Sequence, residues 1–115
     1  MLRVIVESPY AGTVEANVAY AREAMRHCLD HGEAPFASHL LYTQIYDDTD
    51  PKERERGIQA GYEWMHNADL VAFYIDRGWS SGMLMALKVA RLLQKKTEVR
   101  SLYGPVLQLP EETVK

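Results

Sequence analysis

Residues 69–86 read DLVAFYIDRGWSSGMLMA, and this stretch decides the fold. Its first part, 69–75, is a near-continuous apolar run, which is typical of a strand in the middle of a parallel sheet. A turn with glycine and serine follows, and then an apolar helix is expected to begin after Ser80 or Ser81. Many nucleotide sites are built on a strand, a turn and a helix in this order.

The rest of the chain repeats this alternation of strands and helices. The spacing predicts strands at 2–8, 34–38, 69–75 and 98–102, and helices at 14–31, 51–67 and 80–96. Residues 39–48 fit a strand, a short helix or a loop. The alternation predicts a three-layer α/β domain with a doubly wound, mostly parallel sheet of about four or five strands.

Local signals indicate how the helices begin and which side they bury. Asp50 precedes Pro51 and is expected to cap the helix at 51–67, with Glu53 reaching back as in a capping box. Thr13 is expected to cap the helix at 14–31. Two apolar stripes are expected to be buried: Val14, Val18, Ala21, Met25 and Cys28, and Ile58, Gly61, Trp64, Met65 and Ala68.

The composition indicates one globular domain in a reducing compartment. A chain of 115 residues fits a single domain, expected over residues 1–103 with a C-terminal arm at 104–115. The only cysteine, Cys28, excludes an internal disulfide, and the N-terminal apolar run is too short for a signal peptide or a membrane span. A net charge of −3 gives no global positive field. We expect a cytoplasmic protein with no nucleic-acid partner and no membrane partner.

Three turns are expected to meet at one edge of the sheet, because ligands of such folds bind beyond the carboxyl ends of the strands. The turns are SPYAGT at 8–13, SHLLY at 38–42 and DRGWSSG at 76–82. Helix starts at the first and third turns offer free N–H groups to an anion, and Trp79 suits stacking on a ring. The candidate ligand-binding residues are Ser8, Pro9, Tyr10, Thr13, Ser38, His39, Asp76, Gly78, Trp79, Ser80, Ser81 and Gly82.

Each turn also has a purely structural explanation. Serines cap helices, Trp79 can cover the edge of the core, and His39 can be an ordinary loop histidine. His27 and His31 lie one helical turn apart without an obvious third ligand, so we expect no metal, and no cofactor either. The glycines and serines at 78–82 do not match G-x-S-x-G, and no Ser-His-Asp set is evident, so a serine hydrolase is not expected.

Several motifs, taken in order, resemble a known group of proteins. They are VIVESPYAG (4–12), NVAYAREAM (17–25), APFASHLLYTQ (34–44), the run from 47 to 76, SSGMLMALKVAR (80–91) and EVRSL (98–102). Together, over about residues 3–102, they resemble small phage and bacterial proteins related to nucleoside 2-deoxyribosyltransferases. The resemblance implies a flavodoxin-like fold, a pocket that recognises a nucleoside, and an oligomer.

The resemblance also assigns roles to single positions. In the transferases a glutamate attacks the anomeric carbon of the sugar, and it follows by four residues the glycine that opens the late helix. Gly82 matches that glycine, so the nucleophile position is Ala86. The substrate-holding aspartate matches Ser80, and the pocket tyrosine matches Tyr10. Alanine can neither form a glycosyl intermediate nor stabilise an oxocarbenium-like centre.

These departures favour a holding site over a catalytic one. The first hypothesis is non-catalytic binding of a nucleotide-like small molecule, with a phage protein sequestering an ADP-ribose-like or cyclic nucleotide defence signal, as a sponge, in the bacterial cytoplasm. Serines suit a phosphate, because desolvating phosphate beside carboxylates is costly. The second is an enzyme acting on an N-glycosidic bond with a non-standard acid, for which Asp76 and Glu7 are the nearby candidates. The third is a small interaction subunit with a vestigial pocket.

The last helix bears on quaternary structure. Apolar side chains leave it little polar surface: Met83, Leu84, Met85, Leu87, Leu92 and Leu93. A helix that is apolar nearly all round is buried within its own fold or against a partner. The resemblance implies a homo-oligomer, and packing within the monomer is the alternative.

Overall fold

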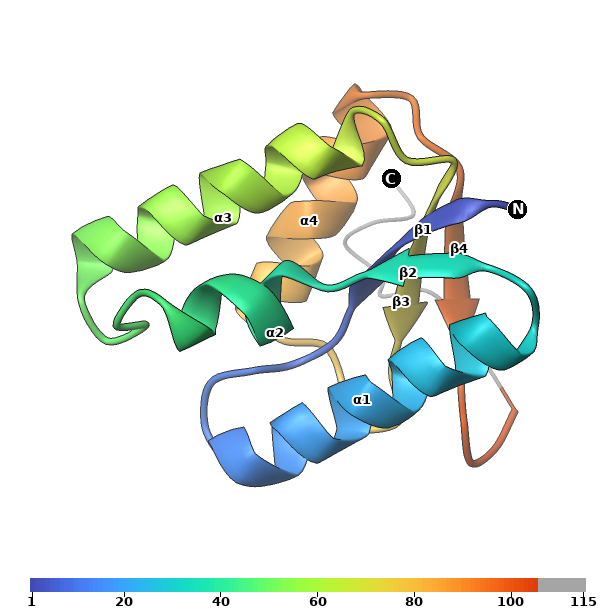
Figure 1. Ribbon diagram of the computed structural model, residues 1–115, viewed down its shortest axis with the longest axis horizontal. Coiled ribbons are helices and arrows are strands. Elements are labelled where there is room, and N and C mark those ends of the chain that lie inside the picture. Colours follow the sequence, from blue (N-terminus) through green and yellow to red (C-terminus); the bar gives the residue numbers. More distant parts are fainter. Residues whose placement is uncertain (106–115) are drawn as a thin grey trace.

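A computed structural model describes residues 1–105 of the chain (Figure 1). Within this range four parallel strands form one sheet: β1 (Arg3–Glu7), β2 (Ala34–Phe36), β3 (Leu70–Tyr74) and β4 (Thr97–Arg100). The helices are α1 (Val14–Asp30), α2 (Ser38–Leu41), the 3-10 turn η1 (Tyr42–Gln44), α3 (Pro51–Met65) and α4 (Ser81–Leu92). The strand order is β2-β1-β3-β4, so the winding reverses between β1 and β3. The predicted doubly wound α/β fold is confirmed, with a sheet that is parallel throughout.

Helices cover both faces of the sheet, which makes three layers (Figure 1). On one face α1 packs against the strands, and Cys28 lies in the same buried cluster as Val6 of β1. On the other face α3 and α4 pack, and Leu87 of α4 shares a second cluster with Ile5 of β1. Successive residues of β1 therefore face opposite layers, as the pleat of a strand requires.

The helices α1 and α3 begin where the sequence predicts, but not every predicted capping hydrogen bond forms. Asp50 caps α3, because its carboxylate accepts a hydrogen bond from the backbone N–H of Lys52 at 3.0 Å. Glu53 does not close a capping box on Asp50; its carboxylate accepts from the N–H of Asp47 at 2.7 Å and orders the preceding loop instead. Thr13 occupies the cap position of α1, but its side chain makes no capping hydrogen bond.

Three expectations about the helices are corrected. Val14 was expected on the buried side of α1, but it is 39% exposed at the first turn of that helix. Trp64 was expected on the buried side of α3, yet it is 53% exposed, and its indole N–H donates to the Tyr42 hydroxyl at 2.8 Å. The reason is that α2 and η1, which the sequence left undecided, pack beside α3 and present Tyr42 to that side. The last helix ends at Leu92 instead of near residue 96, because Gln94 adopts a left-handed φ of 57°.

Two expectations stay open. The predicted C-terminal arm at 104–115 lies mostly outside the described residues, so the arm and the domain boundary remain predictions. On α4, Met83 and Leu87 pack inside the monomer, whereas Met85 is 51% and Leu92 83% exposed, and a homo-oligomer remains a prediction. Within residues 1–105, no helix combines the length and the apolar character needed to cross a membrane.

Candidate functional site

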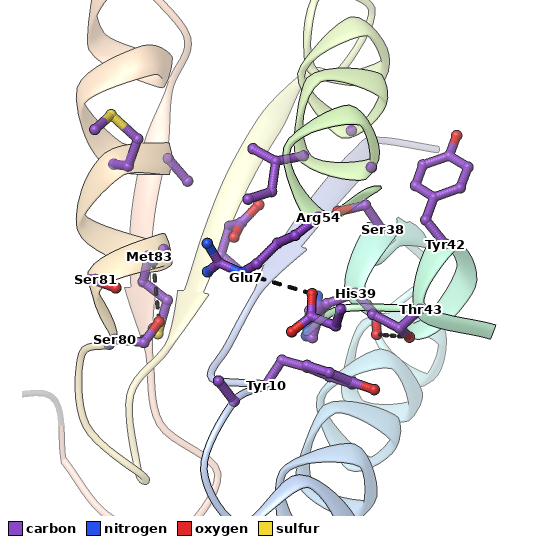
Figure 2. Close-up of a pocket in the computed structure, with 18 of the residues that line it drawn as sticks. Glu7, Tyr10, Ser38, His39, Tyr42, Thr43, Arg54, Ser80, Ser81 and Met83 are labelled. Carbon is purple, nitrogen blue, oxygen red and sulfur yellow. Dashed lines mark hydrogen bonds and ion pairs between the residues drawn. The ribbon is translucent and has the colours of Figure 1, made fainter. Parts of the chain in front are cut away.

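A cavity of about 370 Å³ opens beyond the carboxyl ends of the strands, on the side of α3 and α4 (Figure 2). Its volume falls in the range of small-molecule sites, roughly 300–1,000 Å³. The walls come from the turn after β1, from α2, η1 and the loop that follows, from α3, and from the first half of α4. The lining residues are Glu7, Ser8, Tyr10, Ala11, Ser38, His39, Tyr42, Thr43, Tyr46, Asp48, Glu53, Arg54, Gly57, Ile58, Gly61, Tyr62, Ser80, Ser81, Gly82, Met83, Met85 and Ala86.

The structure brings together candidate residues from all three turns that the sequence analysis singled out. Ser8 and Tyr10 follow β1, Ser38 and His39 lie on α2, and the third turn contributes Ser80, Ser81 and Gly82. The candidates that do not line this cavity are Pro9, Thr13, Asp76, Gly78 and Trp79. The convergence is geometric, and ligand binding by these residues stays a prediction.

Trp79 lies against the core and not in the cavity wall. Its ring stacks on Phe73 of β3, with centroids 5.2 Å apart and planes 28° apart. It belongs to the apolar cluster under α4, so covering the core is its structural role. Gly78, in the same turn, has a φ of +89°, which residues with a Cβ rarely adopt, so the conformation of the turn explains this glycine.

Asp76 fastens the chain after β4 instead of facing the cavity. Its carboxylate accepts hydrogen bonds from the Tyr20 hydroxyl at 2.6 Å, the Leu102 N–H at 2.7 Å and the Tyr103 N–H at 3.2 Å. The Ser101 hydroxyl donates as well. Burial disfavours the charge, but these hydrogen bonds outweigh it and lower the pKa of Asp76 to about 2. Asp76 is thus a structural anchor and no substitute for the missing nucleophile.

Ser80 caps the helix that closes the cavity. Its hydroxyl accepts a hydrogen bond from the N–H of Met83 at 3.1 Å, which fixes the first turn of α4. Ser81, the first helical residue, is exposed and lines the cavity. The start of α4 therefore borders the cavity with small residues. Of the two serines, Ser80 uses its hydroxyl to cap the helix, and Ser81 does not.

Glu7 is one of three acids that line the cavity, beside Asp48 and Glu53, and its place at the end of a strand is what the sequence could indicate. It closes β1, and Figure 2 shows its side chain in the space between α3 and α4. Glu7 is only partly buried by its accessible surface, but its desolvation by the surrounding protein disfavours the charge and raises the pKa of its carboxyl to about 8. Within residues 1–105, the structure gives this carboxyl neither a hydrogen-bond donor nor an ion-pair partner. At neutral pH it is therefore mostly a neutral carboxylic acid.

Ser8 and His39 form a pair in the cavity wall. The Ser8 hydroxyl and Nε2 of His39 are 2.8 Å apart, and Ser8 is only 5% exposed. Burial lowers the pKa of His39 to about 4, so its ring is neutral at physiological pH. A base so weak does little to activate a serine, and the pair is better suited to hydrogen bonding than to nucleophilic attack.

The wall from α3 was not foreseen. Arg54 points toward the cavity, with Nε 3.7 Å from the Asp48 carboxylate (Figure 2). Tyr62 and Ile58 from the same helix and Tyr42 from η1 line the cavity as well. No local signal marks Arg54 and Tyr62, because only the tertiary packing of α3 brings them to the carboxyl edge of the sheet, whereas Tyr42 belongs to the turn at 38–42 that the sequence placed there.

Ala86 lies in the wall of this cavity, on the second turn of α4. It is 1% exposed and packs in the apolar cluster that contains Ile5 and Phe73. The position that the resemblance assigns to the nucleophile therefore carries a methyl group. This wall supplies shape and apolar contact and no reacting group.

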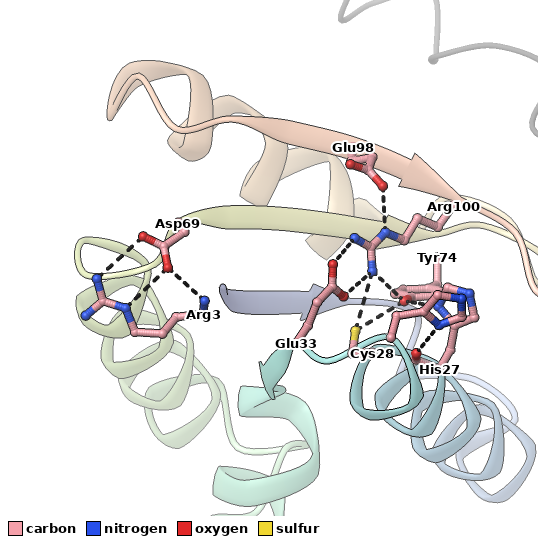
Figure 3. Close-up of polar contacts among 9 residues, drawn as sticks. Arg3, His27, Cys28, Glu33, Asp69, Tyr74, Glu98 and Arg100 are labelled. Carbon is pink, nitrogen blue, oxygen red and sulfur yellow. Dashed lines mark hydrogen bonds and ion pairs between the residues drawn. The ribbon is translucent and has the colours of Figure 1, made fainter. Parts of the chain in front are cut away.

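A separate polar cluster lies at the C-terminal end of α1 (Figure 3), and none of its residues lines the cavity. Arg100 of β4 makes a two-pronged ion pair with Glu33, at 2.8 and 2.7 Å, and donates to the Tyr74 hydroxyl at 2.9 Å. The sulfur of Cys28 and Nδ1 of His27 are also within hydrogen-bond distance of that hydroxyl. The cluster joins β4 and β3 to α1 and to the residue before β2, which is a structural role.

The comparisons with known proteins agree with this architecture. A family model described as "Domain of unknown function (DUF7768)" matches residues 2–100. Among solved structures, a 2-deoxyribosyltransferase from the psychrotolerant bacterium Bacillus psychrosaccharolyticus superposes with a TM-score of 0.65 over 92% of this chain and 77% of that one, at 18% identity. No curated protein sequence matches. The similarity inferred from the motifs is therefore confirmed as a shared fold.

Proposed function

The chain belongs to the DUF7768 family, and we propose that it binds a nucleoside or nucleotide-derived small molecule in the cavity beside β1 without forming a bond to it. The observation that carries the proposal is Ala86 in the cavity wall, at the position of the nucleophile in the enzymes that the chain resembles. A ligand can occupy this wall, but no carboxylate there can attack a sugar.

The character of the cavity supports a ligand with an uncharged ring. His39 is neutral, Glu7 is mostly neutral, and Tyr10, Tyr42 and Tyr62 offer aromatic surface with hydroxyl groups. Nucleobases and sugars present flat faces, ring nitrogens and hydroxyls that suit such walls. Arg54 and the start of α4 offer N–H groups that can bind a more polar or anionic part of the same ligand.

We further propose which class of molecule is the biological ligand. An ADP-ribose-like molecule or a cyclic nucleotide combines a nucleobase with phosphate: the nucleobase suits the part of the wall formed by Glu7, His39 and the tyrosines, and the phosphate suits the start of α4, away from Asp48 and Glu53. A phage protein that binds such a defence signal and leaves it intact would act as a sponge. The resemblance to small phage proteins and the residues at 80 and 86 support this form.

The second candidate function is an enzyme that acts on N-glycosidic bonds, and Glu7 is the observation that favours it. Glu7 is an acid in the cavity, whereas Asp76 is bound elsewhere. A protonated carboxyl could serve as a general acid toward a leaving base. In that case incubation with a nucleoside would release free base, which chromatography detects. A third candidate, an interaction subunit with a vestigial pocket, predicts no binding of any nucleoside or nucleotide.

Calorimetry tests the proposal directly. Adenosine, cytidine, ADP-ribose and cyclic nucleotides are titrated into the wild-type protein, into Tyr10→Ala, and into Arg22→Ala as the control. Tyr10 lines the cavity, whereas Arg22 is exposed on α1 and does not. We expect Tyr10→Ala to weaken binding by about tenfold and Arg22→Ala to leave it unchanged. Equal affinities for all three proteins would show that the site is elsewhere, and no binding by the wild type would overturn the proposal.

A further inference from the structure

Glu7 breaks the pattern of its strand. Val4 and Val6 face α1, and Ile5 faces α3 and α4, so the alternation of β1 directs residue 7 to the side of α3 and α4. That side is apolar at Ile5 and at the neighbouring Phe73, which is the partner of Glu7 in the β1–β3 register. An acid at such a position costs stability and is typical of a functional site.

The surroundings of Glu7 leave its carboxyl free to meet a ligand. Tyr62 of α3 is near enough for the Glu7 charge to raise its pKa, and the other titratable groups that line the cavity include His39 of α2, which is neutral, Arg54 of α3 and Asp48 of the loop before it. Arg54 pairs with Asp48, and it is not among the causes of the shifted Glu7 pKa. The part of α4 that lines the cavity contributes serine, glycine, methionine and alanine and no charged group. The other acids of the cavity wall are Asp48, which pairs with Arg54, and Glu53, whose carboxylate accepts a hydrogen bond from the N–H of Asp47.

The geometry points to Glu7 as the residue that selects the ligand: its carboxyl, as the neutral acid, pairs with a ring edge that presents a hydrogen-bond acceptor beside a donor. Adenine and cytosine present such an edge, with a ring nitrogen next to an amino group. The acid O–H donates to the ring nitrogen, and the carboxyl C=O accepts from the amino group. This inference rests on the proposed function and adds the chemical class of the group that enters the cavity.

The inference has a pH signature that distinguishes it from binding by a carboxylate. Only the protonated acid can donate, and burial holds the pKa of Glu7 at about 8. Affinity for an adenine or cytosine ligand should therefore be constant below that value and fall as pH rises through it. An ionised Glu7 that read two donors, or paired with a cation, would give the opposite slope.

The test compares two substitutions of similar size. Glu7→Gln keeps an acceptor and a donor but does not titrate, whereas Glu7→Met keeps the bulk and has neither. Binding of adenosine, cytidine and ADP-ribose is measured by calorimetry between about pH 6 and about pH 9, a window that includes the Glu7 pKa of about 8. Thermal melts of each variant establish that it is folded.

We expect the wild type to lose affinity above about pH 8, Glu7→Gln to bind with little pH dependence, and Glu7→Met to bind about tenfold more weakly below that pH. Equal affinities of wild type and Glu7→Met would overturn the inference and leave the proposed function standing. Affinity that rises with pH, with weak binding by Glu7→Gln, would overturn it in favour of a carboxylate. No binding of any probe to the folded wild type would overturn the proposed function itself.

Discussion

Single residues decide what this cavity can do. At Ala86 the wall formed by α4 carries a methyl group in place of the nucleophile. Glu7, at the end of β1, adds a carboxyl group to the cavity at a position to which the resemblance assigns no role. Asp76, the other acid near a strand end, is fully engaged by four hydrogen-bond donors. The difference between these two carboxyls is one of environment: hydrogen bonds lower the pKa of Asp76, and desolvation in the cavity wall, with no hydrogen-bond donor from residues 1–105, raises that of Glu7.

The raised pKa of Glu7 has a consequence for stability. The folded protein keeps the Glu7 proton up to a pH of about 8, whereas the unfolded chain releases it near 4.5, so the free energy of unfolding falls as pH rises between these values. In Glu7→Gln this decrease in the free energy of unfolding is absent, because an amide does not titrate. Its melting temperature should match that of the wild type near pH 4.5 and exceed it by about 4 °C or more at pH 8. A difference that does not grow with pH would show that Glu7 is not buried as an acid.

At the scale of elements, the cavity depends on the close packing of α3 against α2. A Cβ added at Gly61 of α3 would lie 2.8 Å from the Ser38 hydroxyl oxygen and 2.9 Å from its Cβ, which is closer than such atoms approach. At Gly57, one turn earlier, the nearest atom would be the Tyr42 Cβ at 3.5 Å, an ordinary contact. The close approach of α2 therefore requires a glycine at position 61 but leaves room for a Cβ at position 57.

Matched substitutions of the two glycines test this packing. Alanine is favoured over glycine inside a helix by about 1 kcal/mol, so Gly57→Ala should be neutral or stabilising. Gly61→Ala should destabilise the protein by about 1–3 kcal/mol, because α2 must move away. Urea denaturation measures both changes. Equal effects of the two substitutions would mean that α2 does not press on α3.

The cluster around Arg100 ties β4 to the start of β2. The side chains of Arg100 and Glu33 are only 11% and 14% exposed, and the guanidinium holds the pKa of Glu33 below its usual value. The stability from this pair is present above the ordinary pKa of a glutamate and is lost as pH falls through the lowered value.

Two glutamates that bind the same guanidinium provide a controlled comparison. Glu33→Gln should cost about 1–3 kcal/mol at neutral pH, with a smaller loss in acid. Glu98 also accepts from Arg100, but it is 46% exposed, and Glu98→Gln should cost at most about 1 kcal/mol. Denaturation curves at neutral and acid pH measure both. A larger effect at Glu98 would contradict the account of the cluster.

At the scale of the whole molecule, the fold could be read from the sequence, and the site only in part. The buried strand 69–75, the Asp50-Pro51 helix start and the alternation of elements gave the sheet and its layers, because these signals are local. The three turns were placed correctly at one edge by the rule for parallel sheets. Arg54 and Tyr62 were missed, and Trp79 and Asp76 were placed in the wrong surroundings, because tertiary packing alone decides those positions.

The central claim is that this protein holds a nucleoside or nucleotide and leaves it intact. The most direct measurement is mass spectrometry of the small molecules that the protein releases on denaturation, after incubation with adenosine, cytidine or ADP-ribose and removal of free ligand. The account predicts the intact molecule in near-stoichiometric amount, with no product in the supernatant. Free base, free ribose or a sugar covalently attached to the chain would contradict it.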